Sequence, residues 1–192
     1  MKFTYFLNEA DKTVVQPKNK VELKKIIEDT IKEQGNKCDL NFIDTSKITD
    51  MSELFYNTKF NGDISKWDVS KVENMDSMFC RSDFNGDISK WDVSHVINME
   101  GMFEFSKFNK DISKWDVSHV KKMRLMFRES KFNGDISKWD VSYVSDLSDM
   151  FYDSEFDGDI SKWDVSDVIN MDHMFKHSPL EGNEPDWYKE RN

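Results

Sequence analysis

The sequence contains few cysteines, few prolines and almost no alanine, and the first scarcity excludes some classes of protein. Its 192 residues include two cysteines, three prolines and, at Ala10, a single alanine. Cys38 and Cys80 permit at most one disulfide bond and do not form a C-x-x-C pair, which excludes a disulfide-rich scaffold and a zinc-finger type of site. We expect both thiols to be free, as in a reducing compartment.

Long apolar runs are also absent. No segment reaches the roughly 18 apolar residues of a membrane-spanning helix, so we expect no membrane span. Met1 to Leu7 leads into the polar Asn8 and Glu9, where a signal peptide would need its apolar stretch. With neither a signal peptide nor a lipid anchor, a cytoplasmic location is expected. The cell surface is the alternative if an export signal was removed.

Charged residues make up 33% of the chain and the net charge is -10. Hydrophobic residues make up 38%, and aromatic residues alone 14%. Such an aromatic content favours a folded protein over a disordered one, despite the high charge.

The dominant feature of the sequence is a repeat of 24 residues. Five full units span 60–179, and partial units, 38–59 and 180–192, flank them. Divergent terminal units are typical of the ends of repeat arrays. The repeat is marked by all six tryptophans: Trp67, Trp91, Trp115, Trp139, Trp163 and Trp187.

Each unit is predicted to contain a strand followed by a short helical or 3₁₀ arc. Ile64, Trp67 and Val69 have the L-x-x-L-x-L spacing of a leucine-rich-repeat strand. Ser70 is predicted to be an N-cap, and Val72, Met75, Met78 and Phe79 then follow at helical spacing. Gly62 is expected to adopt a conformation that other residues disfavour. The predicted strands are 64–69, 88–93, 112–117, 136–141 and 160–165.

These units predict a repeat solenoid in which stacked coils share a parallel β-sheet and one continuous core. The tryptophans lie in an inward column. Asn61 and the asparagines aligned with it should form a second structural column, hydrogen-bonded from coil to coil.

Residues 1–37 lack the repeat and are predicted to form an α+β N-terminal cap for the solenoid of 38–192. Eight lysines against six acidic residues give the cap a net charge of +2, which leaves -12 for the array. Asn19 and Glu22 form a capping box that opens an amphipathic helix with an apolar side, ending at Gly35. Segments 2–7 and 13–16 are predicted to pair as a hairpin. The apolar side of the helix is predicted to consist of Val21, Leu23, Ile26, Ile27 and Ile31.

The unit F-N-x-D-I-S-x-W-D-V-S-x-V-x-N-M-x-x-M-F resembles the bacterial surface-protein repeats of BspA-like type, a family related to leucine-rich repeats. The lead-in D-T-S-K-I-T-D-M at 44–51 and the preceding helix are similar to that family's N-terminal unit. The resemblance implies a right-handed parallel solenoid, and a role in adhesion or partner binding.

The sequence offers little chemistry beyond binding. His95 and His119 share one column, and His173 and His177 are spaced i, i+4, but neither pair has enough further ligands to hold a metal tightly. The aspartates aligned with Asp63 each offer a single carboxylate to a calcium ion. No nucleophile elbow and no phosphate loop is present. We therefore expect no enzymatic activity, no metal site and no cofactor.

Comparison of the five units separates regular outward columns from variable ones. The columns of Lys66 and Asp68 barely change, whereas those of Lys71, Ser77, Cys80 and Arg81 vary between units. A partner without a matching repeat must bind where the units differ, and exposed aromatic and arginine side chains are common anchors at such interfaces. The predicted partner-binding residues are Phe105, Arg124, Leu125, Tyr143, Tyr152, His95 and His119.

Three functions remain open. A protein-binding scaffold is favoured. An acidic decoy could use the charge of -12 to occupy the nucleic-acid groove of an enzyme and inhibit it. A surface adhesin or carbohydrate-binding module would use the regular columns. Direct nucleic-acid binding is disfavoured by the negative charge, and a monomer is expected.

Overall fold

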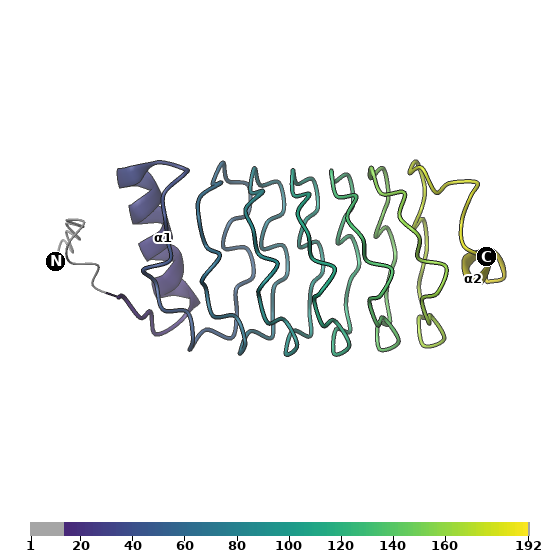
Figure 1. The fold of residues 1–192 in the computed structure, drawn as a ribbon, viewed down its shortest axis with the longest axis horizontal. Helices are drawn as coiled ribbons and strands as arrows, with labels where there is room; N and C mark the ends of the chain where they lie inside the picture. Colours follow the sequence, from purple (N-terminus) through teal and green to yellow (C-terminus); the bar gives the residue numbers. More distant parts are fainter. Residues whose placement is uncertain (1–13, 192) are drawn as a thin grey trace.

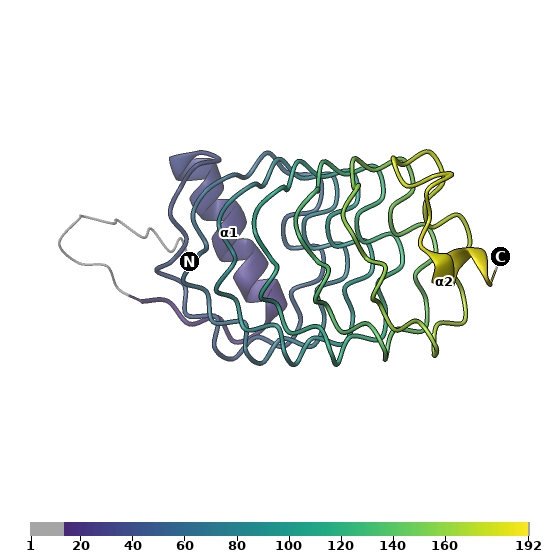
Figure 2. The same cartoon turned by 45° about the vertical axis from the view of Figure 1, so that its right-hand side comes forward.

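The computed structural model describes residues 14–191 as a row of stacked coils with a helix at each end (Figure 1). Helix α1, Lys20–Gln34, lies across the first coil, and the short helix α2, Asp186–Lys189, lies at the last (Figure 2). Each coil contains 24 residues, so equivalent side chains of successive coils lie one above another.

A single aromatic core runs the length of the stack. Phe60, Phe84 and Phe108 are fully buried, and their rings stack with centroids 6.1 and 6.3 Å apart. The first five tryptophans are at most 4% exposed. Each donates its indole N–H to a carbonyl 27 residues earlier, as Trp115 does to Ile88 at 3.2 Å. The predicted inward tryptophan column is therefore confirmed.

The predicted parallel β-sheet is wrong. Within residues 14–191 the only β-type pairing between coils consists of isolated parallel bridges, and no strand forms. The predicted strands consist of tight turns, because the N–H of Trp67 bonds back to Ile64 at 3.1 Å and that of Val72 to Val69 at 2.9 Å. The leucine-rich-repeat strand is therefore not part of this fold.

Main-chain hydrogen bonds join the coils on the side predicted to be helical. The N–H groups of Met75, Ser77, Phe79 and Arg81 donate to carbonyls of the next coil at 2.8–2.9 Å, and equivalent bonds recur along the stack. Between them, the N–H of Met78 bonds back to Met75 at 3.2 Å. We call this set of inter-coil bonds the ladder.

The predicted helical and 3₁₀ arcs are wrong for a backbone reason. Ser77 and Arg81 have φ of 53° and 56°, in the left-handed region, which ends a right-handed helix after one turn. A positive φ at the third residue of the Met75–Met78 turn is the geometry of a type II turn. The same φ values also prevent a regular strand, so the ladder remains a row of single bridges.

Polar columns stabilise the turns outside the core. The Asn61 side-chain carbonyl accepts from the Asn85 N–H at 2.9 Å, and Asn85 accepts from Asn109 likewise, which confirms the structural asparagine column. Ser70 is not a helix N-cap, because the carboxylate of Asp68 accepts both its N–H and its hydroxyl. The carboxylate of Asp116 accepts both groups of Ser118 in the same way. These bonds lower the pKa of Asp116 from its ordinary value of 3.8.

The role predicted for Gly62 is also corrected. Its φ is not in the left-handed region, unlike that of Gly35 or Gly101. Glycine is required here by space, because a Cβ would lie 2.0 Å from the carbonyl oxygen of Cys38 and 2.7 Å from the ring of Phe60.

The N-terminal helix confirms the capping prediction. Asn19 accepts from the Glu22 N–H at 3.0 Å, and Leu23 and Ile27 are buried against the first coil. Val21 is 79% exposed, so its predicted place on the apolar side is wrong. The first half of the predicted hairpin, 2–7, and Thr13 lie outside the described residues. Val15 pairs in parallel with Ile43.

At the other end, the last coil is closed by side chains. Arg191 donates to the carbonyls of Val165 and Val168, and Tyr188 contacts Phe175 edge-on at 4.8 Å.

In the described residues, 14–191, neither helix has the length and apolar character that a membrane-spanning helix needs.

Candidate partner-binding surfaces

The ladder carries the most variable outward side chains. We define the variable face as the four columns that begin at Asp76, Ser77, Cys80 and Arg81. The main chain of these residues forms the ladder, so hydrogen bonds to neighbouring coils hold their backbone on both sides.

Two of these columns hold side chains in a strained backbone conformation. Phe105 has φ 53° and Leu125 has φ 62°. The left-handed region costs an L-residue about 1–2 kcal/mol, a cost that glycine avoids. Gly101, with φ 57°, shows that glycine fits the column of Leu125. The chain thus places large side chains where glycine would be more stable.

We expect the strain to be measurable with two small changes in one column. Gly101→Ala should lower the free energy of unfolding by about 1 kcal/mol, whereas Ser77→Gly should raise it by a smaller amount. Urea unfolding would measure both. If both substitutions shift stability in the same direction, the backbone there is not under left-handed strain.

Arginines and aromatic rings alternate along the variable face. The guanidinium of Arg81 lies 4.1 Å from the ring centroid of Phe105. The guanidinium of Arg128 lies 5.4 Å from Phe105 and 5.2 Å from Tyr152. All three distances fall within the range of cation–π attraction, so the row holds its side chains in place across the coils. Tyr152 in turn contacts His177 at 5.2 Å.

Carboxylates complete this row. Arg128 pairs with Glu104 at 3.0 Å and Glu129 at 3.3 Å, and Arg124 pairs with Glu100 at 3.2 Å. Cys80 is buried beside Glu104, and burial together with the Glu104 charge raises the pKa of its thiol to about 12. This thiol is therefore protonated and unreactive near neutral pH.

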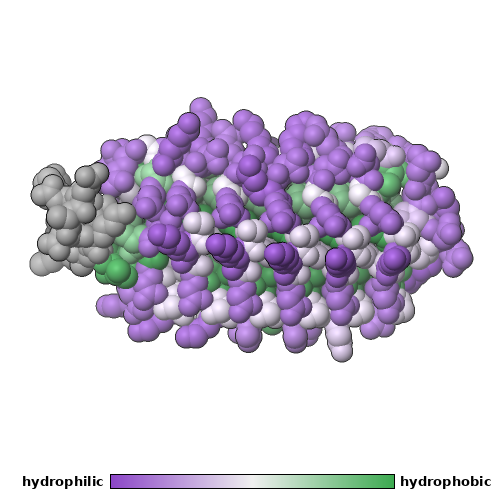
Figure 3. Space-filling model, in the orientation of Figure 1, coloured by the Kyte–Doolittle hydropathy of each residue, from purple (hydrophilic) through white to green (hydrophobic). Residues whose placement is uncertain are grey.

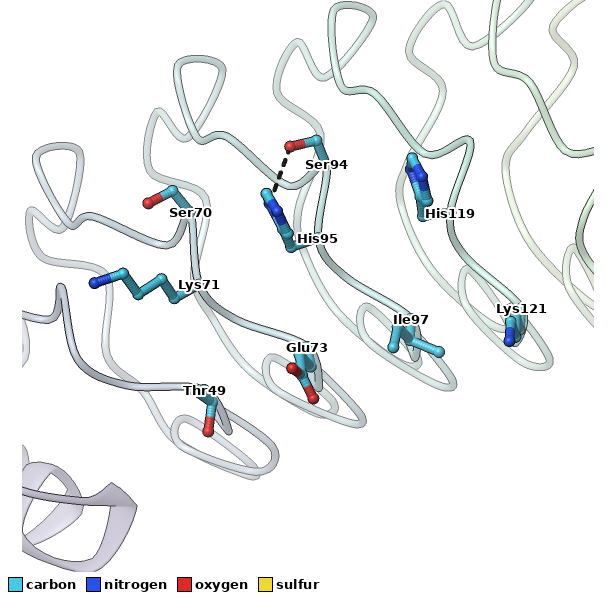
Figure 4. Close-up of a pocket in the computed structure, with 9 residues that line it drawn as sticks. All are labelled: Thr49, Ser70, Lys71, Glu73, Ser94, His95, Ile97, His119 and Lys121. Carbon is cyan, nitrogen blue, oxygen red and sulfur yellow. Dashed lines mark hydrogen bonds between the residues drawn. The ribbon is translucent and has the colours of Figure 1, made fainter.

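A separate groove of about 810 Å³ lies beside the variable face (Figure 4). One wall carries Lys71, His95 and His119 on successive coils, and the other carries Thr49, Glu73, Ile97 and Lys121 (Figure 4). Ser70 and Ser94 also line it.

The regular columns form a third surface. Hydrophilic side chains repeat in rows from coil to coil (Figure 3). Ser65, Lys66, Asp87 and Lys90 surround a shallow depression of about 180 Å³.

The structure divides the predicted partner-binding residues between two places. Phe105, Arg124, Leu125 and Tyr152 lie on the variable face. His95 and His119 line the groove, and Tyr143 shares their column, 67% exposed, without lining it. Sequence reasoning did not select Arg81, Arg128, Ile97 and Lys121. The signal for the two arginines was their position one coil away from an aromatic residue.

No metal centre is assembled within the described part of the chain. Residues 14–191 contain no group of three or more His, Cys, Asp or Glu side chains placed to hold an ion. His173 lies beside Asp149 at 3.8 Å, with His177 directed instead at Tyr152.

Comparison with known families gives one match. Residues 22–131 and 104–187 match the family model described as Mycoplasma protein of unknown function, DUF285. No curated protein and no solved structure matches the chain.

Proposed function

The chain belongs to the family of Mycoplasma proteins of unknown function DUF285, and from this premise we propose that it is a non-enzymatic scaffold that binds another protein through the variable face. The proposal includes no catalytic step and no cofactor. The resemblance of the units to BspA-like surface-protein repeats supports the proposal, because it implies a role in partner binding or adhesion.

One observation carries the proposal: large side chains occupy left-handed positions on the variable face. Backbone strain of this kind is often retained at functional sites, where the side chain performs a task that outweighs its cost. Phe105 is such a residue, and it also lies between the guanidinium groups of Arg81 and Arg128. Aromatic and arginine side chains fixed near the centre of a surface are typical anchors of protein interfaces.

The side-chain contacts on the variable face support the proposal energetically. Binding costs conformational entropy when flexible side chains are ordered. The cation–π contacts and the ion pair of Arg128 with Glu104 already restrict Phe105, Arg128 and Tyr152. A partner would therefore meet a surface that is largely organised before it docks.

Two alternatives use other features of the chain. An acidic decoy would depend on the overall charge of -10, and its binding would weaken strongly with salt. An adhesin or carbohydrate-binding module would use the regular columns of lysine and aspartate. Neither uses the strained aromatic residues, so mutations separate them from the proposal.

The test is capture of a partner from the source organism, followed by affinity measurement with purified partner. Phe105→Ala/Tyr152→Ala should weaken binding by at least about 2 kcal/mol, or roughly 30-fold, and leave folding intact because both side chains are only partly buried. Lys114→Ala/Lys138→Ala, in the regular columns, is the matched control and should bind normally.

Two outcomes would contradict the proposal. If the aromatic variant binds normally while Lys114→Glu or Asp116→Lys abolishes binding, the regular columns are the site. If every variant binds alike and the complex is lost above about 0.5 M salt, the acidic decoy is supported instead.

A further inference from the structure

The asparagine column that begins at Asn61 contains more chemistry than its structural role requires. Asn61, Asn85 and Asn133 are each followed by glycine, whereas Asn109 is followed by Lys110. Asn109 still accepts the inter-coil bond, from the Asn133 N–H at 3.0 Å, so this bond does not depend on the glycine. The column lies outside the variable face, and the inference drawn from it does not rest on the proposed function.

The main-chain nitrogens of the three glycines are not engaged in the fold. Within residues 14–191, the N–H groups of Gly62, Gly86 and Gly134 donate to no protein acceptor. All three glycines are partly exposed, so water reaches them. Each nitrogen is therefore able to lose its proton to the solvent and act as a nucleophile.

The side-chain carbonyls of the asparagines are polarised by the next coil. Oδ1 of Asn61 accepts from the Asn85 N–H at 2.9 Å, and Oδ1 of Asn133 accepts from the Asp157 N–H at 3.1 Å. When a nucleophile attacks Cγ, negative charge develops on this oxygen. A main-chain N–H that already points at the oxygen stabilises that charge.

Glycine also leaves space for the attack. The nitrogen of the following residue and the asparagine Cγ belong to one short stretch of chain, so their reaction closes a five-membered ring within the molecule. A Cβ on the attacking residue crowds this approach, as it does in Lys110, whereas glycine has none. The column thus contains three pairs suited to the reaction and one matched pair that is not.

We infer that Asn61, Asn85 and Asn133 are sites of spontaneous deamidation in the folded protein. The deprotonated glycine nitrogen forms a bond to Cγ, the bond from Cγ to the amide nitrogen breaks, and that nitrogen takes up a proton from water and leaves as ammonia. Water then opens the cyclic imide at either carbonyl carbon, which gives aspartate or isoaspartate. Overall one water is consumed and one ammonia is released, with no oxidation or reduction.

The fold should tolerate both products. In each of them Oδ1 remains bonded to Cγ, as a carboxylate oxygen in aspartate or as a main-chain carbonyl oxygen in isoaspartate, and it is still an acceptor for the next coil. Asp157 already occupies the last place in the column, ahead of Gly158. Each event therefore adds one negative charge to the array without removing the acceptor from the column.

The test is peptide mapping by mass spectrometry after the full chain has been incubated, folded, at pH 7.5 and 37 °C in heavy-oxygen water. Asn133 should be modified at least about tenfold faster than Asn109, because a Cβ hinders only the second attack. The heavy oxygen marks products that form during the incubation. Circular dichroism should show that the modified chain stays folded.

Two matched variants move the reaction along the column. Lys110→Gly should create a new site at Asn109, whose side chain already accepts the inter-coil bond. Gly134→Lys, which copies the third unit, should abolish the reaction at Asn133 and leave Asn61 and Asn85 reactive.

A parallel incubation in urea makes the result decisive. If Asn133 is modified in the unfolded chain but not in the folded one, the fold protects the pair and the inference is overturned. Equal rates at Asn109 and Asn133, or no new site in Lys110→Gly, would also contradict it, because the following glycine would then not determine the reactivity.

Discussion

Replacing Trp115 by alanine should lower the free energy of unfolding by about 3–5 kcal/mol. Trp115 lies in the middle of the stack, is 4% exposed, and packs 6.3 Å from the ring of Phe103. The substitution removes this contact and the indole bond to Ile88, and coils on both sides prevent the cavity from collapsing.

Urea unfolding followed by circular dichroism would measure the loss. Trp187→Ala is the control, because Trp187 occupies the same column at the end of the stack and is only partly buried. It should cost clearly less. Equal losses at the two positions would mean that the central tryptophan is not enclosed by its neighbours.

Gly62→Ala should be the most damaging glycine substitution, lowering the free energy of unfolding by about 2–3 kcal/mol. The added Cβ would lie 2.0 Å from the main-chain oxygen of Cys38, which is held by the bond that it accepts from the Asp63 N–H. A main-chain atom held by a hydrogen bond between coils cannot move as easily as the end of a side chain.

Gly86→Ala is the matched control for this prediction. Its nearest obstacle is a side chain, the Phe84 ring at 2.8 Å, and the nearest main-chain oxygen is 3.4 Å away. The cost there should be smaller. Lys110 occupies the same position in the third unit, so a Cβ is tolerated in the interior of the stack. A larger loss for Gly86→Ala than for Gly62→Ala would contradict the assigned contact.

The inward columns could be predicted from the sequence because buried positions require apolar residues, which recur at the same place in every unit. Trp67, Val69, Met75 and Phe79 recur as apolar residues at fixed spacing, and all are buried. The Asn19 cap was predictable for a similar reason, since its signal is local and chemical.

The backbone conformation could not be predicted, because it depends on where the inter-coil hydrogen bonds form. An L-x-x-L-x-L spacing is compatible with a strand, yet Trp67 and Val72 form tight turns instead. The helical spacing from Val72 to Phe79 is equally compatible with successive turns. Ser77 and Arg81 have positive φ, yet serine and arginine are not residue types from which a positive φ is expected.

The candidate site was predicted in part. Comparison of the units selected Phe105 and Tyr152 because outward columns are free to change, and both lie on the variable face; their partner-binding role stays a prediction. It also placed Tyr143 and the two histidines with them, although the histidines line a separate groove and Tyr143, in the same column, lines neither the groove nor the variable face. Residues one coil apart along the variable columns, such as Arg81 and Phe105, can be recognised as partners only once the stacking is known.

Amide hydrogen exchange of the free protein, resolved by NMR, tests most directly the central claim that the variable face rests on the inter-coil ladder. The N–H groups of Met99, Gly101, Phe103 and Phe105 donate to the next coil and should exchange slowly. Within residues 14–191, the N–H groups of Lys90 and Asp92 have no protein acceptor and should exchange quickly. Slow exchange at Lys90 and Asp92 together with fast exchange at 99–105 would contradict the account, because the coils would then be joined on the opposite side.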